Sequence, residues 1–226
     1  IENFSLRIAG GEKVGIIGKS GAGKSTLLNL LLRFYDLESG RIIIDGQDIS
    51  IVLQESLRSN IGVVTQDTSL LHRSIFDNIA YSSPLASKED VFDAAKKANA
   101  LEFIEDLEDI YGRKGMEAHV GERGVNLSGG QAQRICLARA IIKKPQILIL
   151  DEATSQLDSE TELFIQRAIK ALHKTLTIII VAHRLSTVRF ADTVYVLEGG
   201  AILEHGTYTE LLNKKGRLYE LNELQR

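Results

Sequence analysis

Short apolar runs alternate along the chain with segments whose apolar residues recur at helical spacing. Residues 4–8 alternate Phe4, Leu6 and Ile8, which predicts a half-buried strand. Further strands are predicted at 12–18, 41–46, 60–66, 146–150 and 175–182, and a hairpin at 193–206 that turns at Gly199 and Gly200. Helices are predicted at 24–33, 87–107, 159–173 and after 207. Strands that alternate with helices predict an α/β fold with a mostly parallel core sheet, and an antiparallel β part is expected at the N-terminus.

The predicted helix starts carry recognisable caps. Three of them have Ser or Thr followed three residues later by an acidic residue, as in a capping box: Ser87–Asp90, Ser159–Glu162 and Thr207–Glu210. The middle region lacks long strand patterns, so residues 71–144 are predicted to be mostly helical and to form a subdomain inserted in the α/β core. The whole chain, 1–226, is predicted to be one domain of this kind.

Composition narrows the class of protein. With 44% hydrophobic and 25% charged residues, the 226-residue chain has a globular composition. Its net charge of -3 argues against a nucleic-acid partner. The single cysteine, Cys136, excludes an intramolecular disulfide, is expected to be a small buried residue of a helix, and fits a reducing compartment. The apolar run at 175–182 is far shorter than the ~20 residues that span a bilayer.

A glycine-rich segment at 18–26, here named the phosphate loop, follows a predicted strand and opens a predicted helix. It matches the pattern G-x-x-x-x-G-K-[ST] at every fixed position. Backbone N–H groups of such a loop surround phosphate oxygens, with the lysine on the β- and γ-phosphates and the hydroxyl that follows it on Mg²⁺. The predicted nucleotide-binding residues are Gly18, Lys19, Ser20, Gly21, Ala22, Gly23, Lys24, Ser25 and Thr26.

Polar residues follow three other predicted strands. Asp151 and Glu152 end the apolar strand at 146–150, Gln66 ends the strand at 60–66, and His183 ends the strand at 175–182. Ligands of open α/β sheets bind beyond the carboxyl ends of the strands. Asp151 is therefore predicted to hold Mg²⁺ through water, and Glu152 to polarise the attacking water. Gln66 is a candidate for Mg²⁺ or the attacking water, and His183 for the γ-phosphate.

A second glycine-rich stretch, the LSGGQ motif at 127–131, precedes another predicted helix. Ser128 is a good N-cap, and Gly129 and Gly130 leave backbone N–H groups accessible to an anion. The single chain does not say which anion binds there. One arrangement consistent with both glycine-rich sites is two subunits head to tail, each with its LSGGQ motif over the γ-phosphate held by its partner.

The set GKSGAGKST, Gln66, LSGGQ, ILILDE, SQLD at 155–158 and His183 resembles the nucleotide-binding domain of ATP-binding cassette (ABC) transporters over nearly the whole chain. Residues 61–81 and VGERG at 120–124 resemble the exporter type. The sequence departs from the usual pattern with Gln156 in SQLD and Ala132 in GGQAQR. Neither position touches the expected chemistry.

The resemblance implies ATP and Mg²⁺ as cofactors and a role for each matching residue. The phosphate loop binds ATP; Lys24, Gln66, Glu152 and His183 are catalytic; Ser25, Gln66 and Asp151 hold the metal. Ser128, Gly129, Gly130 and Gln131 face the partner's ATP, and Asp158 helps to build the dimer interface.

The resemblance also implies partners and a location. They are a second nucleotide-binding domain and a membrane domain on the same polypeptide, at the cytoplasmic face of a membrane. An adenine-stacking aromatic residue, the first strands and the membrane-spanning half are expected upstream of Ile1.

Other functions stay open at this stage. A soluble ABC ATPase that acts on DNA or ribosomes shares the same motifs, and so does a cassette that binds ATP without hydrolysing it. A small-molecule P-loop kinase does not account for the LSGGQ motif. The transported substrate is not readable from these residues.

Overall fold

The computed structural model describes residues 1, 4–121, 124–153, 159–172 and 175–225. Its main sheet has six strands in the order β4-β5-β6-β1-β7-β8, all parallel except β8. This confirms the predicted α/β class with a mostly parallel sheet. The strands are β1 (Lys13–Gly18), β4 (Ile61–Val64), β5 (Ile147–Asp151), β6 (Thr177–Ala182), β7 (Thr193–Glu198) and β8 (Ala201–Gly206).

A separate antiparallel pair lies near the N-terminus. Strands β2 (Ile43–Ile44) and β3 (Gln47–Asp48) form it, and α2 (Gln54–Ser59) follows. The predicted strand at 4–8 was wrong. Phe4, Leu6 and Ile8 are half-buried against the core as their alternation requires, but this extended segment enters no described strand ladder. Alternation reports burial, whereas a strand also needs a partner backbone.

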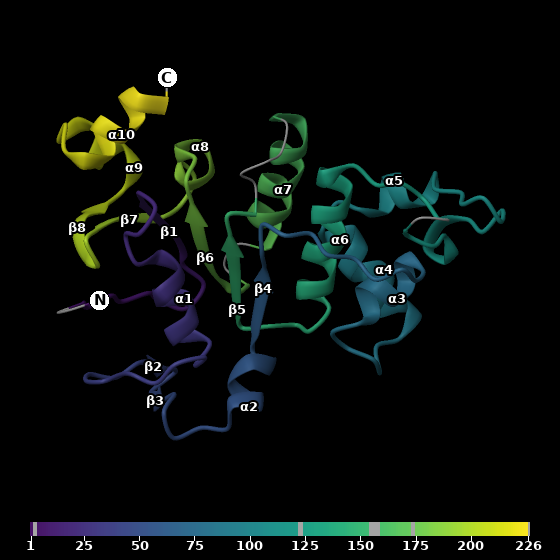
Figure 1. The fold of residues 1–226 in the computed structure, drawn as a ribbon, viewed down its shortest axis with the longest axis horizontal. Coiled ribbons are helices and arrows are strands. Elements are labelled where there is room, and N and C mark those ends of the chain that lie inside the picture. Colours follow the sequence, from purple (N-terminus) through teal and green to yellow (C-terminus); the bar gives the residue numbers. More distant parts are fainter. Residues whose placement is uncertain (2–3, 122–123, 154–158, 173–174, 226) are drawn as a thin grey trace.

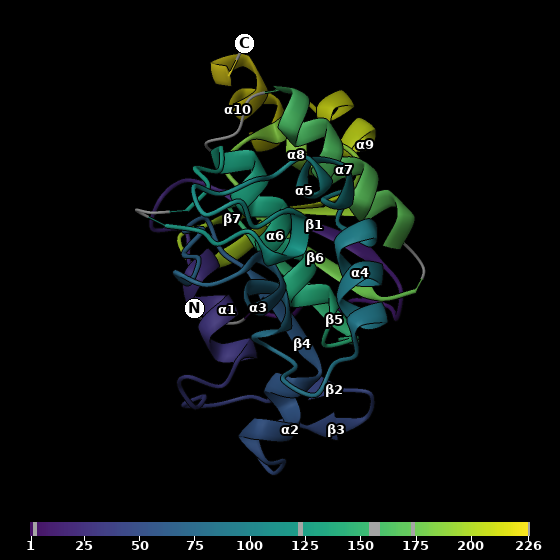
Figure 2. The ribbon, with the colours of Figure 1, turned by 90° about the vertical axis from the view of Figure 1, so that its right-hand side faces the viewer.

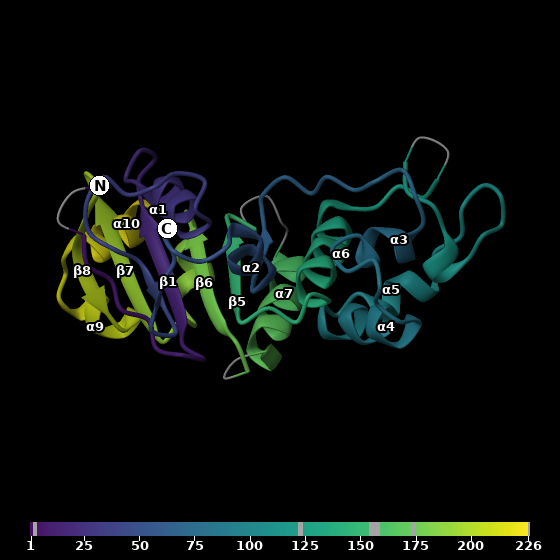
Figure 3. The same cartoon turned by 90° about the horizontal axis from the view of Figure 1, so that it is seen from below.

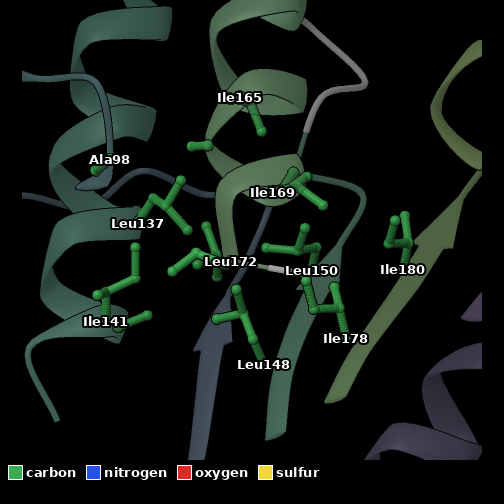
Figure 4. Packing of buried hydrophobic residues seen from close by; sticks show 14 of the residues in the cluster. Ala98, Leu137, Ile141, Leu148, Leu150, Ile165, Ile169, Leu172, Ile178 and Ile180 are labelled. Carbon is green, nitrogen blue, oxygen red and sulfur yellow. The ribbon is translucent and has the colours of Figure 1, made fainter. Parts of the chain in front are cut away.

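Two hydrophobic clusters cover the two faces of the sheet. Because side chains alternate across a strand, neighbouring residues of β5 and β6 join different clusters. Leu148, Leu150, Ile178 and Ile180 face the helices α6 (Gly129–Ile141) and α7 (Ser159–Leu172) (Figure 4). Ile149, Ile179 and Val181 join the cluster of Leu28 in α1 (Lys24–Leu31) on the opposite face.

The molecule extends to one side of the sheet. Figure 1 shows α6 beside the edge strand β4, with more helices beyond it, and Figure 3 shows them at the end of the molecule opposite β8. In Figure 2 these helices stand in front of the strands. They are α3 (Ile75–Ala80), α4 (Lys88–Lys97), α5 (Leu101–Glu105) and the 3-10 turn η1 (Gly115–Glu117).

The predicted helix at 87–107 is two helices. Asn99 has a φ of 53°, in the left-handed region, and ends α4 before α5 begins. The capping boxes of Ser87 with Asp90 and Thr207 with Glu210 are confirmed. Helix α7 begins at Ser159, and nothing described tests the predicted capping box of Ser159 with Glu162. The side chains of both residues lie outside the described part.

The C-terminal part completes the core. Short α8 (Leu185–Val188) follows β6, and the predicted hairpin of β7 and β8 turns at Gly199 and Gly200, both with positive φ. Helices α9 (Tyr208–Asn213) and α10 (Arg217–Gln225) pack on each other. No helix of the described residues is long and apolar enough to cross a bilayer.

Candidate functional site

The predicted site residues lie at one edge of the sheet, where four parallel strands end. Val64 of β4 pairs with Leu150 of β5, Asp151 pairs with Val181 of β6, and Ala182 pairs with Ile17 of β1. The strands therefore end level with one another. Asp151 is the last residue of β5, and Gln66, Glu152, His183 and the phosphate loop come shortly after the buried parts of these strands. Gln66 and His183 were predicted to end their strands, but β4 stops at Val64 and β6 at Ala182, so both residues lie beyond the sheet.

The phosphate loop connects β1 to α1. Gly21 and Gly23 have φ of 80° and 100°, which only glycine adopts without strain. A Cβ on Gly18 would lie 2.4 Å from the Leu197 carbonyl oxygen, so this position has no room for a side chain. Gly23 caps α1 with no side-chain hydrogen bond, and the first turn has no acidic residue. The helix therefore presents free N–H groups and its positive dipole end to an anion.

Lys24 is a buried cation in this loop, only 6% exposed. Its Nζ donates to the carbonyl oxygens of Gly18 at 2.8 Å and Lys19 at 3.1 Å. Burial lowers the pKa of Lys24, and the nearby carboxylates of Glu152 and Asp151 oppose that shift. Ser25 and Thr26 follow Lys24 in the first turn of α1 and are exposed. Lys19 and Ser20, in the loop before Lys24, are exposed as well. Ala22 is buried, and its carbonyl oxygen accepts from the N–H of Gly200.

The carboxylates of Asp151 and Glu152, at the end of β5, lie in the middle of this edge. Burial raises the pKa of Asp151 and Glu152 raises it further, while Lys24 and His183 oppose the rise. Glu152 has a φ of 52°, uncommon for a residue with a side chain. Its N–H donates to the Val181 carbonyl oxygen at 2.8 Å. This conformation directs the chain away from the sheet directly after Asp151.

Glu152 and His183 bind each other across the edge. The His183 Nε2 lies 2.7 Å from the Glu152 Oε1, with the side chains 43% and 22% exposed. A carboxylate whose partner is an imidazole, beside a buried lysine and an anion-binding loop, is arranged to take a proton from water at a phosphate. The pairing of these two side chains was not part of the sequence prediction.

The LSGGQ motif begins α6 as predicted. Ser128 is the N-cap: its Oγ accepts from the Gln131 N–H, and the Gln131 Oε1 accepts from the Ser128 N–H. Gly129 is exposed, Gly130 is buried, and a Cβ on Gly129 would meet nothing within 4 Å. Figure 1 places α6 and α1 on opposite sides of β4 and β5. Within one chain, the phosphate loop and the LSGGQ motif therefore begin helices that lie on opposite sides of β4 and β5.

Several supporting residues were not predicted. Gln133 in α6 is buried and its Nε2 donates to the Thr65 carbonyl oxygen at 3.1 Å, one residue before Gln66. Arg139 donates to the side-chain and backbone oxygens of the buried Asn78, both at 2.8 Å. The sequence signal for these contacts was a polar residue among the apolar residues of a predicted helix.

The C-terminal helix also supports the site. The Gln225 Nε2 donates to the His183 carbonyl oxygen at 2.6 Å, and its Oε1 accepts from the Leu185 N–H at 3.0 Å. Nothing in the sequence pattern indicated this contact. Asp158 and Gln156, by contrast, lie outside the described residues, as do Glu122 and Arg123 of VGERG.

Comparison with known proteins decides the family. The sequence profile of the ABC transporter family matches residues 1–155. The chain belongs to the ABC transporter family. It is 56% identical over 216 residues to an "Uncharacterized ABC transporter ATP-binding protein" of Haemophilus influenzae, covering 96% of this chain and 35% of that protein. It is 50% identical over 219 residues to the "Alpha-hemolysin translocation ATP-binding protein HlyB" of Escherichia coli O157:H7, covering 97% and 30%.

Solved structures give the same answer. A chain of the "Structure of a bacterial Atm1-family ABC exporter with ATP bound" matches with a TM-score of 0.89 and 45% identity, over 98% of this chain and 38% of that one. The exporter-type ATP-binding domain inferred from the motifs is therefore confirmed. The chain spans only 30% to 38% of the length of these relatives.

Proposed function

We propose that the chain hydrolyses ATP and thereby powers the export of a substrate across a membrane, with Glu152 as the general base. The observation that carries this proposal is the edge formed by the phosphate loop, Lys24, Asp151 and the Glu152–His183 pair. The loop and the start of α1 hold the phosphates of ATP. Lys24, whose Nζ now rests on loop carbonyls, turns to the β- and γ-phosphates. Glu152 accepts the proton of the attacking water, and His183 orients Glu152 and contacts the γ-phosphate.

The residues present fit Mg²⁺. The exposed Ser25 hydroxyl, the half-buried Asp151 carboxylate and the exposed Gln66 amide are oxygen donors, which this cation prefers, and Mg²⁺ usually takes few protein ligands besides phosphates. When bound, Mg²⁺ neutralises negative charge on the phosphates. Asp151 would hold it from the end of β5, Ser25 from the first turn of α1, and Gln66 from the segment after β4.

We further infer that the complete site is shared by two cassettes. The Ser128 cap and the exposed Gly129 at the start of α6 offer a second anion site, on the far side of β4 and β5 from the phosphate loop. A head-to-tail pair brings the LSGGQ motif of each subunit, with Gln131, to the γ-phosphate of the other. Asp158 is proposed to lie at the same interface.

The relatives suggest the setting of this reaction. They include proteins named "Putative multidrug export ATP-binding/permease protein" and translocation ATP-binding proteins. We therefore propose a membrane domain as the partner, a location at the cytoplasmic face of a membrane, and residues 71–144 as a helical subdomain of one cassette, 1–226. These names favour export over the alternative of a soluble ATPase that acts on DNA or ribosomes.

The test replaces Glu152 by Gln, which keeps the shape but cannot accept the proton. The rate of phosphate release should fall roughly 10²- to 10⁴-fold, the usual contribution of a general base. ATP affinity should stay close to that of the wild type, because Lys24 and the loop are unchanged. Glu38→Gln, the same change in an exposed loop, is the matched control and should keep full activity. Near-normal phosphate release by Glu152→Gln would remove Glu152 from the base role.

A further inference from the structure

A buried carboxylate lies far from the catalytic edge, in the loop after α5. The side chain of Asp109 is 0% exposed. Its Oδ1 accepts from the N–H groups of Tyr111 at 2.9 Å and Arg113 at 3.2 Å, and its Oδ2 accepts from the Arg113 Nε at 2.7 Å. The Oδ2 also accepts from the N–H of His119 at 3.1 Å. A charge buried in this way is costly unless such donors surround it, so the side chain fixes the backbone around it.

His119 is the point at which three segments meet. Besides its bond to Asp109, it forms an antiparallel bridge with Ser74, the N-cap of α3. The Val120 N–H donates to the Arg73 carbonyl oxygen at 2.9 Å. The His119 carbonyl oxygen accepts from the Val125 N–H at 2.8 Å. Asp109 thus holds His119 in the middle of the short segment 118–120, whose backbone bonds both the start of α3 and Val125 in the segment leading to α6.

This segment ends at the LSGGQ motif. Val125 stands three residues before Ser128, and Leu127 between them packs against the large core cluster. Helix α3 also packs on α6. The position of the α6 N-terminus therefore depends on His119 from two directions: along the chain through Val125, and through Ser74 and α3. None of these contacts involves the phosphate loop.

We propose that Asp109 is a positioning residue for the LSGGQ motif: by fixing His119, it places the Ser128 cap for the partner's ATP. The proposal rests on the shared site of the proposed function. A motif displaced by even an ångström loses most of its effect on a reacting phosphate, because the transition state tolerates little misalignment. Loss of Asp109 should therefore slow hydrolysis while each subunit still binds ATP in its own loop.

The first experiment uses Asp109→Asn, which keeps the size of the side chain but replaces one acceptor oxygen by a donor. Its hydrolysis rate should fall roughly 10- to 100-fold, with the affinity of the separate subunit for a fluorescent ATP analogue unchanged. Arg113→Ala is the matched control and should stay near wild-type activity, because the three backbone N–H groups keep their acceptor. An equal loss in Arg113→Ala would contradict backbone anchoring as the cause.

Complementation then separates positioning from a general loss of structure. An equimolar mixture of Asp109→Asn with Lys24→Ala contains pairs with one intact site, built from the loop of the first variant and the LSGGQ motif of the second. Its activity should exceed several-fold the sum of the variants alone. The double variant Lys24→Ala/Asp109→Asn, mixed with wild type, forms mixed pairs with no intact site. This mixture should therefore show no hydrolysis beyond that of its wild-type pairs.

Ser128→Ala mixed with Lys24→Ala serves as the reference, because Ser128 belongs to the LSGGQ motif itself. If this pair complements and the Asp109→Asn pair does not, Asp109 acts elsewhere and the inference is overturned, while the shared site stands. If the reference pair fails to complement, the shared site fails and the inference fails with it. Complementation by both pairs supports the assignment.

Discussion

At the scale of single residues, the positions of the candidate site residues could be predicted, because the motifs that contain them fix the backbone around them. Lys24 follows glycines whose positive φ no other residue adopts readily, and Asp151 and Glu152 come directly after the three buried residues of β5. The pairing of Glu152 with His183 was not readable, since 31 positions separate the two residues and only the parallel register of β5 and β6 brings them together.

Asp90 gives a prediction about pH at this scale. Its side chain accepts from the Ser87 N–H in the cap of α4 and binds the Lys144 Nζ at 2.8 Å. These contacts, with Lys144 the largest, lower the pKa of Asp90 from 3.8 to about 2. The folded state therefore favours the charged form, and the contribution to stability is full above about pH 4 and lost as the pH falls through about 2.

Replacing Asp90 by Ala should lower the Tm at pH 7 by about 2–5 °C, because both the cap and the ion pair are lost. Thermal unfolding of both proteins between pH 7 and pH 3 should show the difference narrowing below about pH 4. Asp93→Ala, which removes only an exposed ion pair with Lys97 on the same helix, should change the Tm less. A difference that widens in acid would contradict the assignment.

At the scale of elements, the pattern of apolar residues located strands and helices but not their ends or partners. The segment at 4–8 alternates correctly and still finds no described ladder. The helix predicted over 87–107 breaks at Asn99, where the N–H of Ala100 bonds back to the Ala95 carbonyl oxygen. Asparagine after two lysines is a recognised helix end, so this break was present in the sequence and was missed.

Gly15 gives a prediction about how elements pack. A Cβ added there would lie 2.8 Å from the Val188 Cβ and 3.3 Å from the Ala191 Cβ, so glycine lets α8 lie directly on β1. Gly15→Ala should cost about 1–3 kcal/mol of unfolding free energy, as overpacked cores do. Urea unfolding of this variant should be compared with that of Gly10→Ala, where a Cβ meets nothing within 4 Å. If the two variants have the same unfolding free energy, α8 moves to accept the added Cβ without loss of stability, and the prediction is wrong.

At the scale of the whole molecule, the arrangement separates two anion sites that the sequence places in one chain. Figure 3 shows a long molecule, with β1 and α1 toward one end and α3, α4 and α5 at the other. The phosphate loop belongs to the first part, and the LSGGQ motif begins the helix that joins the second part to β4. This separation is why a second cassette is proposed to complete each site.

A shared site makes hydrolysis depend on concentration. While most subunits are separate, the rate per subunit should rise in proportion to protein concentration, because the active species is a pair. Phosphate release should be followed over a hundredfold range of the chain, with total protein kept constant by an inert carrier. A constant rate per subunit, in samples that sedimentation shows to be monomeric, would contradict the shared site.

The sequence by itself determined the fold class and located the phosphate loop and the residues proposed to be catalytic, because these depend on local requirements. Glycines at a phosphate, a buried strand before two carboxylates, and a serine before a helix each leave a pattern within a few residues. The tertiary structure alone decided which of these patterns share an edge, that Glu152 binds His183, and that Asp109 and Gln225 support distant motifs. Such contacts join positions far apart in the chain, and the spacing of residues along a sequence does not encode them.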